Sequence, residues 1–557
     1  MQQAAGVTHT IKSFFTFERI FILILILAFF LRFSLLDLKL LHHDEALHAK
    51  FCYDLLTKGT WQYDPSYHGP FLYYSTTGLF ALIGPSDFAA RVLPSLFGLC
   101  IIPLVWCIHR IGYISKTQAL VAALFIAISP DMVYFSRFLR HDIFMLFFTM
   151  LLLVAILYYF ERGQTRFVLL AAVAAACALC CKEEMPVIII LFALIVVFFI
   201  RNEQFVLPEH WKTDLILATL LVITIMSIFY SAFFNHPDTL VGQHFSITPQ
   251  GFLFDMKTTG WYQAIDHWTN MHNLQRLGGP FYFYVPLFLL YELPIFLLAI
   301  IGTVRFMTGG LHPGLFFKEV KTWIRERRFS LPTGEPTAAS LQQVQGGEDG
   351  NRKSLEFFRF CILWMLGTMV FYAYIGEKVP WLILPQLLPM CFVATYQLNW
   401  QKIAFALAGC IFLVVMTWHV AFVPADISEP IVQVQNSEDM REVMGLMDNA
   451  NLTVIASTSY WPLPWYYRGD RWKKVTLYRS MKDLDTMLQM KPDVIIFHDT
   501  ESYPSLPGYG KKTCKLSYWF SSYDNQDRLP EYYLSRDGKL GSINIDVFIQ
   551  DRVAVPS

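Results

Sequence analysis

The apolar stretch IFILILILAFFLRFSLL (residues 20–36) and the polar segment HHDEALH (residues 42–48) that follows it indicate the class of fold. A helix of 17 mostly apolar residues covers most of a hydrocarbon layer about 30 Å thick. No small-residue cleavage site follows the run, which we therefore interpret as a retained membrane helix and not as a removable signal peptide. The pair of segments predicts a membrane helix that ends beside a cluster of charged residues.

Similar apolar runs recur along most of the chain. Apolar residues make up 55% of its 557 residues and charged residues only 16%, which excludes an ordinary soluble protein. We expect about eleven α-helical spans, near residues 20–36, 88–109, 117–134, 142–160, 167–181, 186–200, 213–234, 281–306, 357–375, 381–398 and 403–422. The 44 Lys and Arg residues balance the 44 Asp and Glu residues, so no net charge favours a nucleic acid as partner.

The distribution of Lys and Arg predicts the orientation. With the N-terminus in the cytoplasm, the inside segments carry 17 of these residues and the outside segments 9. The membrane domain is expected over residues 1–423, with residues 307–356 as a flexible cytoplasmic loop rich in Gly, Pro and Gln. Residues 424–557 are expected to form an external soluble α/β domain, because the β-branched runs 453–457 and 493–498 alternate with helical stretches.

The same orientation places the unusual polar segments on one face. They are residues 42–48 (HHDEALH), 63–70 (YDPSYHGP), 136–142 (SRFLRHD), 182–184 (KEE), the long loop 235–280 and 376–378 (GEK). Charged residues near a bilayer are energetically costly, so they are retained mainly where they take part in binding or catalysis. We therefore predict one shared external site, whose alternative is a set of residues that merely mark the membrane boundary.

The acidic candidates for catalysis are Asp44, Glu45 and Asp142. Adjacent residues point to different sides of a helix, so Asp44 and Glu45 are not expected to form a carboxylate pair. Asp44 shares a helix face with His48, four residues later, and is the preferred general base. For Glu45, a role in the site and a position that only marks the membrane boundary fit the sequence equally well. Asp142 is a second candidate carboxylate, from another loop.

Cations and aromatic residues complete the predicted site. Arg137, Arg140, Lys182 and Lys378 are candidates to hold a phosphate, although snorkelling at the membrane surface also explains such residues. Candidates for substrate binding are His48, His68, His141, Glu183, Trp261, His267, Arg276 and Glu377. The aromatic residues of the long loop suit either sugar rings or lipid headgroups. No metal-ligand spacing stands out among the histidines, so we expect no cofactor, with a divalent metal as the alternative.

Together these motifs resemble a known family. The sequence is similar to the GT-C membrane glycosyltransferases, in the branch of protein O-mannosyltransferases and lipid A aminoarabinose transferases. It is most similar to the archaeal and bacterial flippase-activity-associated proteins of surface glycosylation. HHDEALH, YDPSYHGPFLYY, YFSRFLRHD, CKEE and GEKVPWL carry the resemblance, over about residues 40 to 385. The catalytic acid of the first external loop in this superfamily aligns with Asp44.

The resemblance implies an enzyme with a lipid-linked substrate. The implied donor is a polyprenyl-phosphate sugar, the acceptor is a glycan, lipid or protein, and the transfer inverts the anomeric centre. Membrane lipids and other proteins of a glycosylation pathway are the further partners. An alternative is a flippase for lipid-linked oligosaccharides, or its accessory subunit. Transporters place charges near mid-membrane and often contain inverted repeats, neither of which is visible in the sequence, so we rank transport second.

Overall fold

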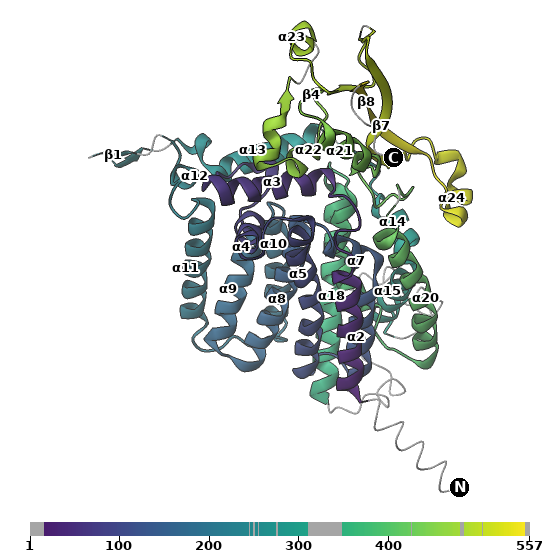
Figure 1. Cartoon of the computed structure of the whole chain (residues 1–557). Coiled ribbons are helices and arrows are strands. Elements are labelled where there is room, and N and C mark those ends of the chain that lie inside the picture. Colours follow the sequence, from purple (N-terminus) through teal and green to yellow (C-terminus); the bar gives the residue numbers. More distant parts are fainter. Residues whose placement is uncertain are drawn as a thin grey trace.

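The structure is a computed structural model of the whole chain. It describes residues 16–243, 246–248, 251–253, 255–274, 277–309, 348–424, 426–478, 484–503 and 505–551. A bundle of apolar helices forms one body, and a domain with a β-sheet projects from one end of it (Figure 1). The predicted fold class, a helical membrane protein with a C-terminal α/β domain, is confirmed.

Five of the described helices are long and apolar enough to cross a membrane unbroken. They are α5 (Asp87–Arg110), α8 (His141–Arg162), α11 (Trp211–Tyr230), α18 (Glu348–Tyr374, from Arg352 on) and α20 (Trp400–Phe422). Shorter helices of the bundle are α2 (Phe17–Phe33), α4 (Phe71–Ile83), α9 (Thr165–Leu179), α10 (Met185–Arg201) and η3 with α19 (Pro380–Ile383 and Leu384–Val393). A helix or helix pair covers each of the predicted segments, while their number as true spans stays a prediction.

Two further candidate spans are bent pairs of helices. α6 (Lys116–Ile128) meets α7 (Pro130–Ser136) at 56°, and α14 (Tyr284–Tyr291) meets α15 (Leu293–Met307) at 115°. Each second helix has a proline in its first turn, where the missing N–H costs no hydrogen bond. The chain therefore breaks before Pro130 and before Pro294.

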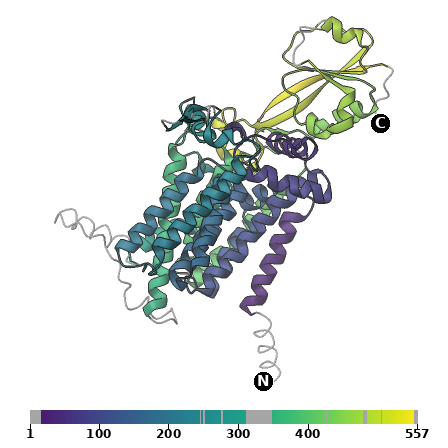
Figure 2. The same cartoon turned by 90° about the vertical axis from the view of Figure 1, so that its left-hand side faces the viewer.

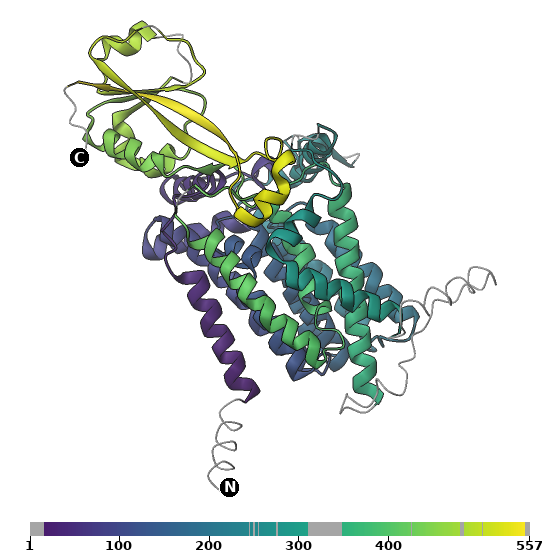
Figure 3. The same cartoon turned by 90° about the vertical axis from the view of Figure 1, so that its right-hand side faces the viewer.

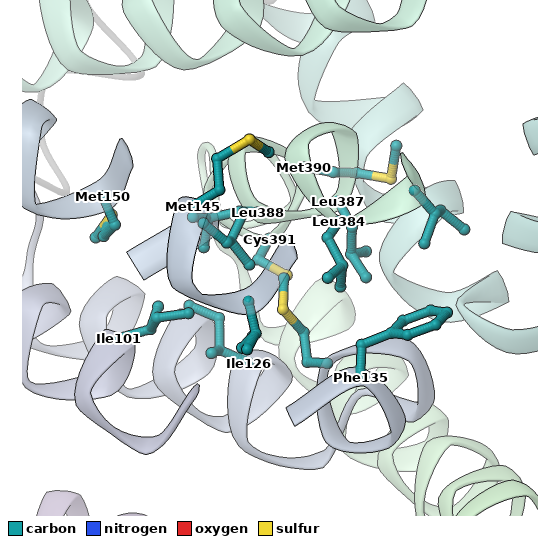
Figure 4. Close-up of a cluster of buried hydrophobic side chains, with 14 of the residues drawn as sticks. Ile101, Ile126, Phe135, Met145, Met150, Leu384, Leu387, Leu388, Met390 and Cys391 are labelled. Atoms are coloured by element: carbon teal, nitrogen blue, oxygen red, sulfur yellow. The ribbon is translucent and has the colours of Figure 1, made fainter. Parts of the chain in front are cut away.

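Bulky apolar side chains fill the space between the helices. Figure 4 shows Ile101 of α5, Ile126 of α6, Met145 of α8, and Leu384 and Leu388 of α19 in one cluster of apolar side chains. All five side chains are buried. Leu and Ile residues on the outside of α2, α11 and α20 are instead exposed in the isolated chain, as expected of a surface that faces lipid.

Several short elements lie across the end of the bundle from which the sheet domain projects (Figures 1 and 2). They are α3 (His43–Lys58), η1 (Pro65–Tyr67), α12 (Asp238–Val241), β1 (Ser246–Thr248), β2 (Gly251–Leu253), η2 (Met256–Thr258) and α13 (Gly260–Leu274). Most of the predicted polar segments belong to these elements or to neighbouring loops at this end. The fold thus brings segments that are distant in sequence to one face.

The C-terminal domain contains a six-stranded mixed sheet in the order β3-β7-β8-β6-β4-β5. The strands are β3 (Gln435–Asn436), β4 (Thr453–Ala456), β5 (Val475–Leu477), β6 (Val494–His498), β7 (Tyr509–Phe520) and β8 (Leu540–Gln550). The helices are α21 (Asp439–Asn449), α22 (Leu463–Tyr466), η4 (Gly469–Lys474), α23 (Leu484–Gln489), η5 (Gln526–Arg528) and α24 (Leu529–Ser535). The two predicted strands are β4 and β6, which pair in parallel. The predicted domain boundaries remain predictions, and most of the loop 307–356 lies outside the described residues.

Candidate active site

Asp44 and Arg140 form the centre of the candidate site. Asp44 lies in the first turn of α3, and its carboxylate accepts a hydrogen bond from the Arg140 guanidinium at the start of α8. The Arg140 guanidinium carbon also lies 3.6 Å from the ring centroid of Trp381 in η3. This arrangement of a buried arginine stacked on an indole fixes the plane of the guanidinium. Three segments that are distant in sequence therefore meet at Asp44.

A chain of alternating charges continues inward from Arg140. Its Nε donates to Asp142 Oδ2 at 3.2 Å, and Asp142 Oδ1 accepts from Lys182 Nζ at 2.8 Å. Lys182 Nζ lies a further 3.4 Å from Glu184 Oε1. The Asp44 side chain is 31% exposed, whereas those of Asp142 and Glu184 are 2% and 10% exposed. Among these three carboxylates, Asp44 is thus the one that a substrate can reach.

The charges of the chain stabilise one another. Burial raises the pKa of Asp44, but Arg140 and the neighbouring histidines oppose it and hold the pKa well below its usual range. Burial lowers the pKa of Lys182, while Asp142 and Glu184 raise it, with a net rise above its ordinary value. The Asp44 carboxylate is therefore ionised at neutral pH, and Lys182 carries a positive charge.

His68 links the predicted HGP motif to the KEE loop. Its Nδ1 is 2.8 Å from Glu183 Oε2, and the Tyr63 hydroxyl donates to Glu183 Oε1 at 2.9 Å. The indole of Trp268 in α13 stacks on the His68 ring, with 5.1 Å between centroids and 2° between planes. The HGP motif also lies close to the backbone at the end of α9. Only glycine fits at position 69, because a Cβ there would lie 2.2 Å from the Cys180 carbonyl oxygen.

His48 and His141 lie close to His68. The ring of His141 is 5.1 Å from that of His48 and 5.2 Å from that of His68, centroid to centroid. His48 Nδ1 bonds the Tyr73 hydroxyl at 2.8 Å, and His141 Nε2 lies 3.1 Å from the Gly69 carbonyl oxygen. Burial lowers the pKa of His48 to about 3, so its ring is neutral. Within the described residues, no three His, Cys, Asp or Glu side chains are arranged to hold a metal ion.

Glu45 occupies a buried position next to Asp44 and bonds four donors. Its Oε1 accepts from Arg91 Nε and the Leu139 N–H, both at 2.8 Å. Its Oε2 accepts from Arg91 Nη2 at 2.6 Å and the His42 N–H at 2.9 Å. With every lone-pair direction used, this placement favours a structural role in which Glu45 joins α3 to α5 and to the start of α8.

Arg137 and Lys378 lie apart from the charge chain and cap helices. Arg137 donates to carbonyl oxygens at the end of α2, including those of Ser34 and Leu35 at 2.6 and 2.8 Å. Lys378 Nζ lies within 2.8 Å of three carbonyl oxygens at the end of α18. Cations at helix C-termini satisfy unpaired carbonyls and the helix dipole. Of the four predicted phosphate ligands, the structure brings only Arg140 and Lys182 next to Asp44 or Asp142.

The remaining predicted residues are at the edge of the site. Trp261 is half exposed at the start of α13, and the His267 ring is 5.0 Å from that of Trp268, centroid to centroid. Glu377 lies in the loop between α18 and η3, next to Lys378. Arg276 lies outside the described residues.

Several residues of the site are not among the predicted site residues, although Trp268 belongs to the aromatic loop 235–280 noted in the sequence. Trp381 and Trp268 stack on predicted residues, and the Tyr372 hydroxyl donates to Glu184 at 3.1 Å. Trp381 lies within the GEKVPWL motif, and this motif was the feature of the sequence that could have identified it as a site residue. Arg91, which binds Glu45, was hidden inside an apolar span.

The sequence profile of the dolichyl-phosphate-mannose-protein mannosyltransferase family matches residues 67–230. No curated protein matches the chain. Among solved structures, ArnT from Cupriavidus metallidurans bound to undecaprenyl phosphate has a TM-score of 0.53 at 13% identity, over 96% of this chain and 99% of that chain. The Archaeoglobus fulgidus oligosaccharyltransferase matches with a TM-score of 0.47 at 12% identity, over 82% of this chain and 64% of that chain.

The Saccharomyces cerevisiae protein O-mannosyltransferase Pmt1-Pmt2 complex, bound to its sugar donor, matches over 40% of this chain and 35% of that chain, at 15% identity and a TM-score of 0.34. The profile match, over residues 67–230, includes His68, Arg140, Asp142 and Lys182. The likeness to ArnT extends over nearly the whole chain and shows the same fold. The family match over residues 67–230 and the fold shared with ArnT both indicate the GT-C superfamily of membrane glycosyltransferases.

Proposed function

We propose that this protein transfers a sugar from a polyprenyl-phosphate carrier to a hydroxyl group of a glycan, lipid or protein, with inversion at the anomeric carbon. The observation that carries the proposal is the partly exposed Asp44 carboxylate in contact with Arg140, at the membrane-domain end covered by the C-terminal domain. That ArnT of the same fold binds undecaprenyl phosphate supports a lipid-phosphate donor.

The geometry suits a single displacement. Asp44 takes the proton of the acceptor hydroxyl, whose oxygen bonds to the anomeric carbon as the bond from that carbon to the phosphate oxygen breaks. The polyprenyl phosphate leaves with the electron pair of that bond. Phosphate is a good leaving group, so no general acid is required, and the positive charges of Arg140 and Lys182 stabilise it. We propose that the reaction needs no metal ion, so a chelator is expected to leave the rate unchanged.

The proposed reaction takes place outside the cytoplasm. This assigns the N-terminus and the loop 307–356 to the cytoplasm and the C-terminal domain to the exterior, as the Lys and Arg distribution favours. A single cysteine introduced near Gly508 should react with a membrane-impermeant reagent in intact cells, and one near Gly346 should not. Reaction at both positions would contradict this orientation.

One observation favours the second candidate, a flippase. The side chains of Asp131 and Glu292 are buried at the breaks between α6 and α7 and between α14 and α15. The backbone N–H of Asp131 donates to Glu292 Oε1 at 3.1 Å, while Asp131 Oδ2 and Glu292 Oε2 have no donor among the described residues. Carboxylates at broken membrane helices are typical of ion-coupled transporters.

Two measurements distinguish these functions. Purified protein in proteoliposomes should convert a polyprenyl-phosphate sugar and an acceptor to product and free polyprenyl phosphate. Mass spectrometry of intact glycans from a deletion strain should show the loss of one sugar. Complete loss of surface glycan, with lipid-linked precursor accumulating inside, would favour the flippase.

A further inference from the structure

The segment that leads into the proposed base is held by the C-terminal domain. The N–H of Leu40 donates to Glu438 Oε1 at 3.2 Å, and its carbonyl oxygen accepts from Gln435 Nε2 at 3.1 Å. The N–H of Leu41 donates to the Tyr466 hydroxyl oxygen at 3.0 Å, and its carbonyl oxygen accepts from Asn436 Nδ2 at 2.6 Å. All four backbone groups of two consecutive residues therefore bond to side chains more than 390 positions later in the chain.

The side chain of Leu40 strengthens this attachment. It is 1% exposed and belongs to the apolar cluster of the C-terminal domain, which includes Met440, Val443 and Leu516. The loop thus contributes a residue to the core of a domain other than its own. Figure 1 shows α3 lying across the end of the bundle beneath α21 and α22, and Figure 3 shows from another side how the sheet domain stands on this end.

His42 continues the attachment to Asp44 itself. The backbone N–H of Asp44 donates to His42 Nδ1 at 3.0 Å, so Nδ1 of the neutral ring carries no proton. The proton is then on Nε2, which donates to the carbonyl oxygen of Gln433 in the C-terminal domain. One ring therefore caps the first turn of α3 with one nitrogen and binds the C-terminal domain with the other.

We propose that His42 is a positioning residue, through which the C-terminal domain holds the Asp44 carboxylate in the orientation that proton transfer needs. The proposal rests on the function proposed above. It also gives the C-terminal domain a role in the reaction, since a shift of about 1 Å in a catalytic group is enough to slow catalysis by about 100-fold.

Two substitutions separate the two bonds of the ring. His42→Asn places an amide oxygen near the position of Nδ1, so it keeps the cap and loses the bond to Gln433. His42→Gln places an amide N–H near the position of Nε2, so it keeps that bond and loses the cap. We expect each variant to reduce kcat by about 10-fold or more, with the KM for the donor unchanged. Lys473→Ala, which removes an exposed ion pair with Asp470 elsewhere in the same domain, should have the wild-type rate.

A double variant tests whether His42 acts through Asp44. In an Asp44→Asn background the proton acceptor is already absent, so adding His42→Asn should cause no further loss of the residual rate. An equal loss in both backgrounds would overturn the proposal, as would a wild-type rate in His42→Asn. Should the His42 variants fail to fold, Asn436→Ala serves in their place, because it removes the bond to the Leu41 carbonyl oxygen from the other side.

Hydrogen–deuterium exchange provides a readout that needs no activity. Residues 38–47 should exchange faster in His42→Asn and Asn436→Ala than in the wild type, while α8 stays unchanged. Unchanged exchange in this segment would overturn the positioning role. Faster exchange together with a wild-type protein that transfers no sugar would instead contradict the proposed function and leave the attachment itself established.

Discussion

The guanidinium of Arg140 stacks on the indole of Trp381, with 3.6 Å between the guanidinium carbon and the ring centroid. The same guanidinium bonds Asp44 and Asp142. The indole therefore limits how the cation that holds the proposed base can turn. This relationship explains why η3 belongs to the site, although Lys378, which lies just before η3, caps the end of α18.

Replacement of Trp381 by Leu should slow sugar transfer. Loss of a cation–π contact of about 0.5–2 kcal/mol corresponds to a rate about 2- to 30-fold lower, when the contact stabilises the transition state by that much more than the bound ground state. The measurement is the transfer rate of purified protein under saturating donor. Trp418→Leu is the matched control, since Trp418 is 62% exposed on α20 and far from the charge chain in sequence. Equal rates for both variants would contradict this role of Trp381.

Gly69 should not tolerate a side chain. A Cβ at this position would lie 2.2 Å from the Cys180 carbonyl oxygen, so Gly69→Ala forces apart the HGP motif and the end of α9. We expect a loss of stability of about 1–3 kcal/mol, seen as a lower midpoint of thermal unfolding, and a lower transfer rate because His68 moves. Gly78→Ala is the control, because nothing lies within 4 Å of its Cβ position on α4. If the two variants melt at the same temperature, the close approach is not required.

The apolar periodicity of the sequence located the helices well. In lipid each backbone N–H and C=O group needs a hydrogen-bond partner within the protein. An apolar run such as residues 213–234 provides these partners by forming a helix. Strands β7 and β8 were not predicted, because their pairing depends on residues far apart in sequence, and Lys511, Lys512 and Lys515 mask the apolar character of β7. Local patterns carry little information about such pairings.

The site was predicted in part for similar reasons. Asp44, Asp142 and Lys182 stand out as charges at helix ends, and the fold brings them together. Glu45 and Arg137 have the same appearance in sequence, but their hydrogen bonds depend on packing partners such as Arg91 and the end of α2. Asp131 and Glu292 were overlooked because each is a single acid within a long apolar run.

His48 should make the stability of the protein depend on pH. The Tyr73 hydroxyl donates to the Tyr67 carbonyl oxygen, so His48 Nδ1–H donates to the Tyr73 hydroxyl oxygen. Burial lowers the pKa of His48 from 6.5 to about 3, and the unfolded chain therefore binds a proton at a higher pH than the folded chain does. This contribution to stability is complete above pH 6.5 and is lost as the pH falls towards 3, by up to about 1.4 kcal/mol per pH unit.

His48→Asn keeps a donor near the position of Nδ1 and removes the titration. Thermal unfolding at pH 7, 6 and 5 should therefore show a smaller decrease in the unfolding midpoint for the variant than for the wild type. Identical decreases would show that His48 is not a neutral buried group.

In the proposed mechanism Asp44 accepts the proton of the acceptor hydroxyl, and Asp44→Asn removes this function. The substitution keeps the shape of the side chain and removes the proton acceptor, so turnover should fall by about two to four orders of magnitude. The variant should stay folded and bind the polyprenyl-phosphate donor with nearly unchanged affinity, since Arg140 and Lys182 are the proposed phosphate contacts. Transfer by folded Asp44→Asn protein at near the wild-type rate would contradict the account.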